Sequence, residues 1–209
     1  MLIKALDLMV AKPEKIAEEA DAILSKYSKR QEKAEVDDEI RKLASDKIIR
    51  NYSYMSGFSG GITALSGIVP GVGTLVAVSG GVTADVALCM KFQIEMVMAI
   101  AHIYDHKILD EEQKRVCFVI AGLGAINSSG QAGTKRVGSK AFTKLVQQYL
   151  KGPTLVAVKE VLKKVGITFT RKGLEKAIPF GIGSAVSFAA NKSLTWYVGI
   201  KARDFFKAG

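Results

Sequence analysis

Hydrophobic positions recur along most of this chain with the period of an α-helix. In Pro13–Ser28 the apolar side chains lie three and four residues apart, and Pro13 suits the first turn of a helix. Asp37 or Asp38 is expected to cap the next helix, whose apolar stripe runs from Ile40 to Met55. Strand-like runs such as VCFVIAG and GITFT are too few to form a sheet. The pattern predicts an all-α fold, a helical bundle.

The segment Asn51–Ala84 contains no Asp, Glu, Lys, Arg or His, although the fifty residues before it carry 22 charged side chains. It holds eight glycines, and Pro70-Gly71 divides it near its middle. Because a bilayer-spanning helix needs ~20 apolar residues, each half is at most marginal for a span. We therefore expect a glycine-rich helical hairpin, either in contact with a membrane or at the core of the bundle. Close helix contact would compensate for the low helix propensity of its glycines, Gly61 and Gly81 among them.

Further helices are expected on both sides of a loop at Asn127–Gly138. The second arm of the hairpin continues to Tyr104, and Asp110 is expected to cap the helix after it. An amphipathic helix around Leu155–Val165 is predicted to end at Gly166, with Lys159, Lys163 and Lys164 on its exposed side. A second charge-poor stretch, Ala177–Ile200, contains a single charged side chain, that of Lys192.

The net charge of +10 is unevenly distributed. Residues 1–50 carry 11 basic and 11 acidic side chains, residues 51–134 carry 4 and 6, and residues 135–209 carry 15 and 3. The excess of +12 in the last third indicates binding to an anionic surface, either lipid headgroups or nucleic acid. We expect Lys159, Lys163, Lys164, Trp196, Lys201 and Arg203 to form this surface, with Trp196 at the interfacial level. The aromatic residues do not alternate with arginines as in nucleic-acid platforms, so no nucleic-acid partner is expected.

A second candidate site is a polar cluster within apolar segments, made of Asp85, Lys91, Glu95, Asn191 and Lys192. Lys91 and Glu95 are four residues apart, so they are expected to pair on an exposed helix face. Asp85 has no basic neighbour within one turn, and Lys192 or Asn191 is the expected partner. A structural buried pair is favoured over a catalytic one.

Other chemistries find little support. Gly71-Val-Gly73 and Gly122-Leu-Gly124 lack the remaining residues of phosphate-binding motifs, so they are interpreted as packing glycines. His102 and His106 are four apart, but no third ligand is apparent, and the end of a helix explains them better than a metal does. No catalytic residue, cofactor or metal is expected. Cys89 and Cys117 lie in apolar contexts typical of reduced, buried thiols.

Several segments resemble motifs of the EcsC family. They are the run GITFTRK at Gly166–Lys172, the following Ala177-Ile-Pro179 with Gly183 and Asn191, the closing segment Lys201–Phe206, and Ala99–Tyr104, which is similar to the family's I-A-x-x-Y-G. Asp105 stands where that last motif usually has glycine. The resemblance covers Gly57–Phe206 and extends to the related YcjF-type membrane proteins. It divides the chain into N-terminal amphipathic helices, residues 1–50, and an EcsC-like helical domain, residues 51–209.

The resemblance implies a bacterial, membrane-associated protein. Asp7 interrupts the apolar N-terminal stretch, which is therefore not a convincing signal peptide, and the cysteines are typical of reduced thiols. We therefore expect the cytoplasmic side of the inner membrane, with peripheral or partially inserted attachment. The first named member is encoded beside an ABC transporter, and the family has no catalytic residues to carry over. The resemblance and the positive charge of residues 135–209 together predict a non-enzymatic protein that docks on anionic lipids or on a membrane protein complex. The alternative is a soluble helical bundle that binds a lipid, an apolar ligand or a protein partner. The hydroxyl side chains of Asn51–Ala84 favour this alternative.

Overall fold

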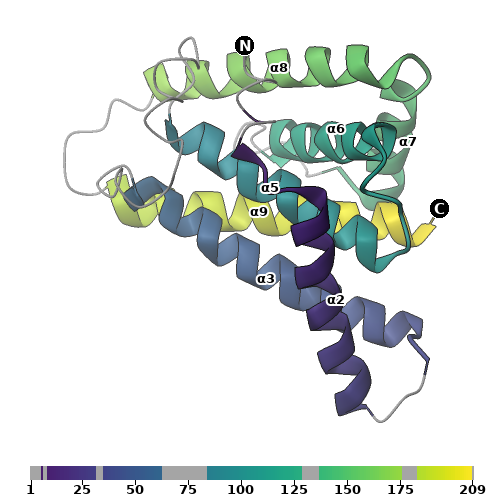
Figure 1. Cartoon of the computed structure of the whole chain (residues 1–209). Helices are drawn as coiled ribbons and strands as arrows, with labels where there is room; N and C mark the ends of the chain where they lie inside the picture. The colour runs from purple at the N-terminus through teal and green to yellow at the C-terminus, as the bar shows by residue number, and fades with distance from the viewer. Residues whose placement is uncertain are drawn as a thin grey trace.

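The structure of the chain, a computed structural model, describes residues 6, 9–31, 35–62, 84–128, 137–175 and 183–208. Every element in these ranges is an α-helix, which confirms the predicted all-α bundle (Figure 1). The helices are α2 (Pro13–Arg30), α3 (Asp38–Ile62), α5 (Ala84–Ile103), α6 (Glu111–Ser128), α7 (Ser139–Tyr149), α8 (Thr154–Glu175) and α9 (Gly183–Ala208).

Helix α5 lies at the centre of the bundle. From Ala87 to Ala101 every side chain except that of Lys91 is buried, because α2, α3, α6 and α9 all pack against this helix. A helix that is apolar on all sides must be covered on all sides. Its large aliphatic and methionine side chains each contribute about 1.5–3 kcal/mol on burial, so α5 supplies much of the hydrophobic core.

The other helices are arranged in layers around α5. Helix α8 runs along one side of the bundle and packs on α6, while α3 runs along the opposite side and packs on α9 (Figure 1). Helices α3 and α9 are antiparallel, since Asp46 pairs with Arg203 and Asp38 pairs with Lys207 at 3.3 Å. Their other ends, near Ile62 and Gly183, therefore lie together.

Helix starts follow the predicted capping residues. Pro13 begins α2, and the side chain of Asp37 accepts the N–H of Ile40 at 2.9 Å, so Asp37 caps α3. The side chain of Asp110 accepts the N–H of Glu112 at 3.2 Å at the start of α6. These caps stabilise backbone N–H groups that have no partner within the helix.

One sequence expectation about α8 is wrong, because this helix does not end at Gly166 but continues to Glu175. The strand-like runs VCFVIAG and GITFT lie inside α6 and α8, in agreement with the all-α prediction. An interior glycine costs only ~1 kcal/mol, which the packing of the buried face of α8 against α6 outweighs. The centre of the predicted hairpin, residues 63–83 with Gly81, lies outside the described residues.

Asp105 follows α5 in the left-handed region, with φ of 63°. The N–H groups of Asp105 and His106 bond to the carbonyls of His102 and Ala101, at 2.9 and 3.0 Å. This is the Schellman arrangement, in which glycine is the usual residue. Arg41 holds the aspartate in place, because it pairs with the Asp105 carboxylate at 2.6 Å and also donates to the carbonyl of Ile103. A tertiary contact thus holds Asp105 in a backbone conformation that usually favours glycine.

Several glycines outside residues 63–83 mark close helix contacts. A Cβ at Gly122 would lie 2.3 Å from Val161 Cγ1, and one at Gly124 would lie 2.9 Å from Val198 Cγ2. A Cβ at Gly199 would lie 2.7 Å from Ile49 Cγ1. The interpretation of Gly122 and Gly124 as packing glycines is therefore confirmed.

We expect Gly122→Leu to lower the free energy of unfolding by about 1–3 kcal/mol or more, because the new side chain must displace Val161 and separate α6 from α8. Urea unfolding measures the change. Gly152→Leu is the control, since nothing lies within 4 Å of a Cβ at that position. Equal stability of the two variants would show that α6 and α8 are not in close contact.

Candidate functional site

Lys91 and Glu95 form the predicted ion pair, but not on an exposed face. Lys91 Nζ lies 2.7 Å from Glu95 Oε1, and the Glu95 side chain is buried. The same oxygen accepts the N–H of Ala11 at 2.7 Å. The exposed-face prediction is wrong because the segment preceding α2 covers this side of α5. The pair joins the N-terminal segment to the core.

Lys192 makes a contact that the sequence analysis did not predict. Its Nζ lies 3.8 Å from the ring centroid of Tyr54 and 5.9 Å from that of Phe188, which is cation–π geometry. Asn191 is half-buried on α9. Asp85 lies in the first turn of α5, but its side chain is outside the described part, so its pairing with Lys192 stays a prediction.

A buried hydrogen-bond network joins α3, α5 and α9. Thr195 Oγ1 donates to Ser56 Oγ at 2.8 Å, and Gln93 Nε2 donates to Thr195 Oγ1 and to Cys89 Sγ, both at 3.3 Å. Ser56 and Cys89 are also in contact at 3.1 Å. Because polar groups in a core need partners, this network fixes the rotation of the three helices about their axes.

The rotation of α3 places two aromatic side chains on the surface. Successive helical residues are 100° apart, so Tyr54 and Phe58, each two positions from the inward-facing Ser56, point outward. They are 44% and 60% exposed. The ring of Phe188 on α9 packs edge-on against the ring of Phe58, with 5.0 Å between the ring centroids. Its centroid lies 6.5 Å from that of the Tyr54 ring. We call Tyr54, Phe58, Phe188 and Lys192 the aromatic patch.

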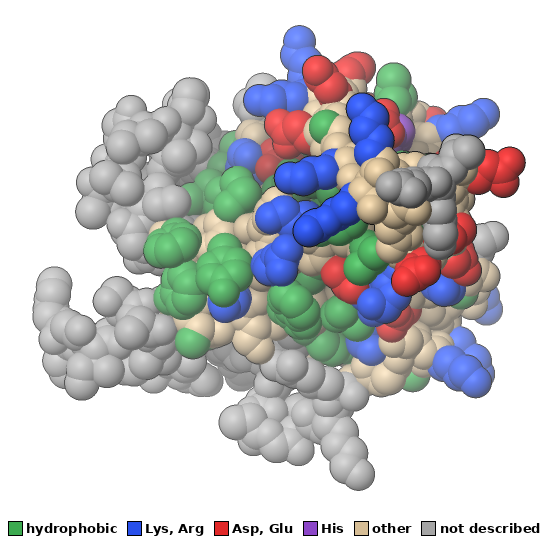
Figure 2. All heavy atoms as spheres, turned by 90° about the horizontal axis from the view of Figure 1, so that it is seen from below, with side chains coloured by type: hydrophobic (Ala, Val, Ile, Leu, Met, Phe, Trp, Pro, Cys, Tyr) green, Lys and Arg blue, Asp and Glu red, His purple; other side chains and the backbone are tan. Residues whose placement is uncertain are grey.

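Basic side chains border the aromatic patch. Lys47 and Arg50 lie seven and four residues before Tyr54, so they share its face of α3, and Arg50 is exposed. The exposed Trp196 follows Lys192 by one turn of α9. Figure 2 shows a continuous hydrophobic area on this face of the molecule, next to a group of Lys and Arg side chains. Gly57 allows this contact between α3 and α9, since a Cβ there would lie 2.7 Å from the Phe188 ring.

Four of the six residues predicted to form an anionic-membrane surface are exposed. Lys159, Lys163 and Lys164 lie on the outer side of α8, and Trp196 lies on α9. The two others are placed wrongly by the sequence analysis. Lys201 is buried and donates to Ser139 Oγ at 2.9 Å, and its burial lowers its pKa. Arg203 pairs with Asp46 and Asp204 at the interface of α3 and α9, because α9 is covered on that side.

The described residues offer no arrangement typical of a metal centre. His102 Nε2 lies 2.8 Å from Asp21 Oδ1, and His106 packs on the ring of Phe206. Both histidines line an open hollow of about 510 Å³, yet no group of three His, Cys, Asp or Glu side chains in the described residues is placed to hold a metal. Cys89 and Cys117 are buried free thiols, and burial raises the pKa of Cys117.

None of the helices in the described ranges is both long enough and apolar enough to cross a bilayer. No protein-family model, curated protein or solved structure matches this chain. The resemblance to the EcsC family therefore stays a prediction based on its sequence motifs. The fold and the surface define an all-α bundle with an exposed aromatic patch bordered by basic side chains.

The sequence analysis missed the aromatic patch. Tyr54 and Phe58 lie in the charge-free segment, whose hydropathy suggests a core or membrane contact, although they follow Lys47 and Arg50 at helical spacing. This spacing was a readable signal for one face of α3. The contribution of Phe188, 130 positions further along the chain, had no local signal.

We expect Lys91→Met to lower the free energy of unfolding at pH 7 by about 3–5 kcal/mol, because it leaves the Glu95 carboxylate buried without its counter-ion. The double variant Lys91→Met/Glu95→Gln should recover most of this loss, since the glutamine oxygen still accepts the N–H of Ala11. Urea unfolding measures the free energy of unfolding of the single and the double variant.

A double variant as unstable as Lys91→Met would contradict the pairing and indicate that the lysine acts through packing alone.

Proposed function

We propose that this chain is a membrane-associated helical protein, not an enzyme, that docks peripherally on anionic lipid through the aromatic patch of α3 and α9. The observation that supports this most directly is the exposure of Tyr54 and Phe58 beside the cation of Lys192. Large aromatic rings are costly to leave in water, and they are enriched at membrane interfaces, where the ring contacts acyl chains and a polar edge meets headgroups.

The charge next to the patch suits anionic lipid. Lys47, Arg50 and Lys192 lie on or beside the same face, and each basic residue near an anionic membrane contributes ~1 kcal/mol. Three of them would contribute roughly 3 kcal/mol, which is enough for reversible attraction but not for permanent attachment. The aromatic rings then supply the apolar contact that electrostatic attraction alone lacks.

The position of the patch in the chain also supports the proposal. The patch lies on the last turns of α3 and the first turns of α9, and the sequence that follows α3 at Ile62 remains free of charge up to the start of α5 at Ala84. The patch is therefore followed in the sequence by a stretch without charged side chains, and such a composition is compatible with an apolar environment.

The alternative, a soluble bundle that binds an apolar ligand, has weaker support. An apolar hollow lies between α2, α3 and α5 and is lined by side chains such as Ile16, Tyr52 and Ala99, but its volume is about 120 Å³. Sites for drug-sized molecules usually measure about 300–1,000 Å³. A membrane protein partner remains an alternative occupant of the aromatic patch.

Co-sedimentation with vesicles tests the proposal. The full chain is expected to bind vesicles of phosphatidylcholine mixed with phosphatidylglycerol, and to bind pure phosphatidylcholine weakly. Lys47→Gln/Arg50→Gln should weaken binding about 30-fold, which corresponds to about 1 kcal/mol for each charge. Tyr54→Ser/Phe58→Ser should weaken it by about tenfold or more through lost apolar contact.

Two control variants separate the patch from general effects. Lys26→Gln/Lys29→Gln removes the same charge from exposed positions on α2, and Leu109→Ser removes an exposed apolar side chain elsewhere. Both should bind like the original chain. Binding that is indifferent to phosphatidylglycerol, or equal losses in the patch and control variants, would refute docking through this patch.

A further inference from the structure

Helix α8 has an inner and an outer face of different character. Its inner face, Ala157, Val158, Val161, Leu162 and Val165, is buried, and α8 packs on α6. The close approach at Gly122 fixes which side of α8 faces the bundle. The outer face is therefore set by packing.

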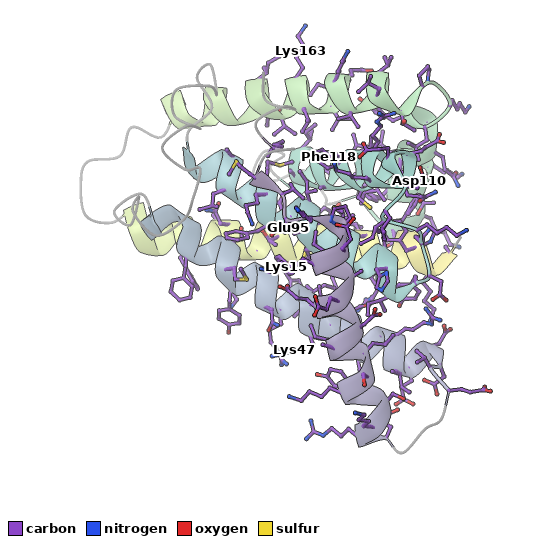
Figure 3. All side chains as sticks on the ribbon, viewed as in Figure 1. Lys15, Lys47, Glu95, Asp110, Phe118 and Lys163 are labelled. Atoms are coloured by element: carbon purple, nitrogen blue, oxygen red, sulfur yellow. The ribbon has the colours of Figure 1, made fainter. Side chains whose placement is uncertain are left out.

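The outer face of α8 combines lysines with exposed aliphatic side chains. Val156, Lys159, Lys163 and Ile167 follow one another at steps of three and four residues, so they lie along one stripe. Val156 and Ile167 are 58% and 57% exposed. Lys163 points away from the bundle (Figure 3). We call these four residues the α8 stripe.

Basic charge surrounds the α8 stripe. Within residues 137–168 six lysines are exposed and one acidic residue, Glu160, is present. Glu160 pairs with Lys164 at 2.8 Å, so the one carboxylate of this range is bound by a lysine outside the stripe. The surface is thus strongly positive, and its lysine stems and aliphatic side chains together resemble the face of an interfacial helix.

The α8 stripe and the aromatic patch face opposite sides of the molecule. In Figure 1 the layers of α6, α5 and α9 separate α8 from α3. In Figure 3 Lys163 lies at the upper edge of the molecule, whereas Lys47 lies near α3 on the lower side. One flat bilayer cannot contact both surfaces at once.

From these observations we propose that the α8 stripe is a second surface for anionic lipid, so that the bound protein bridges two anionic bilayers. The proposal rests on the proposed function, because bridging needs the aromatic patch on the first bilayer. Anionic lipid fits the stripe better than nucleic acid does, since Val156 and Ile167 gain from an acyl environment and not from a phosphate backbone.

The test measures vesicle clustering and vesicle binding in parallel. The full chain is added to vesicles of phosphatidylcholine mixed with phosphatidylglycerol, and dynamic light scattering follows particle size while co-sedimentation measures bound protein. We expect the original chain to cluster the vesicles. Lys159→Gln/Lys163→Gln should remain bound through the aromatic patch but cluster at least about tenfold more slowly, as should Val156→Ser/Ile167→Ser.

Lys26→Gln/Lys29→Gln is the matched control, because it removes the same two charges from exposed positions on α2. It should cluster vesicles at the original rate. Inorganic phosphate added at constant ionic strength should leave clustering unchanged if the bilayer surface is bound. Abolition of clustering by inorganic phosphate would overturn the proposal in favour of a site for the free anion.

The remaining outcomes also decide the proposal. Binding without clustering by the original chain would overturn the bridging proposal and leave the proposed function intact. Absence of vesicle binding would refute the proposed function itself. Undiminished clustering by the α8 variants would overturn the proposal and point to self-association. Binding of an RNA homopolymer that depends on Lys159 and Lys163, without clustering, would overturn it and assign the stripe to nucleic acid.

Discussion

The burial of α5 is the constraint on which the other features of this bundle depend. Almost every side chain of this helix lies away from water, so the remaining helices must cover it on all sides. The Lys91–Glu95 pair lies within that cover, and Glu95 also holds the backbone at Ala11. A buried carboxylate with two partners is costly to disturb, which makes the attachment of the N-terminal segment specific.

The packing of α3 against α9 determines the surface at one side of this core. Their antiparallel arrangement, secured by Asp46 with Arg203 and by Ser56 with Thr195, determines which residues of each helix can face water. Tyr54, Phe58 and Phe188 meet at the end of the pair because the polar network keeps Ser56 inside. The aromatic patch is therefore a consequence of how the helices of the core are oriented about their axes.

Basic residues that are close together in the sequence of the C-terminal third differ in their exposure in the folded structure. Lys201 and Arg203 are used inside the bundle, where they contact Ser139 and Asp46, whereas the lysines of α8 remain exposed. Basic residues of the C-terminal third thus contribute to internal pairs, to the outer surface of α8 and, through Lys192, to the aromatic patch. Lys47 and Arg50, which border the aromatic patch, come from α3 and from the N-terminal fifty residues, whose net charge is zero.

The sequence by itself determined the helical class, the capped helix starts at Pro13, Asp37 and Asp110, and the exposed lysines of α8, because these depend on spacing within one or two turns. Only the tertiary structure decided that Glu95 is buried, that α8 continues past Gly166, and that Tyr54 meets Phe188. Each of these depends on what packs against a helix from a distant part of the chain. Local periodicity identifies the apolar face of a helix, but it does not identify the neighbour that will cover it.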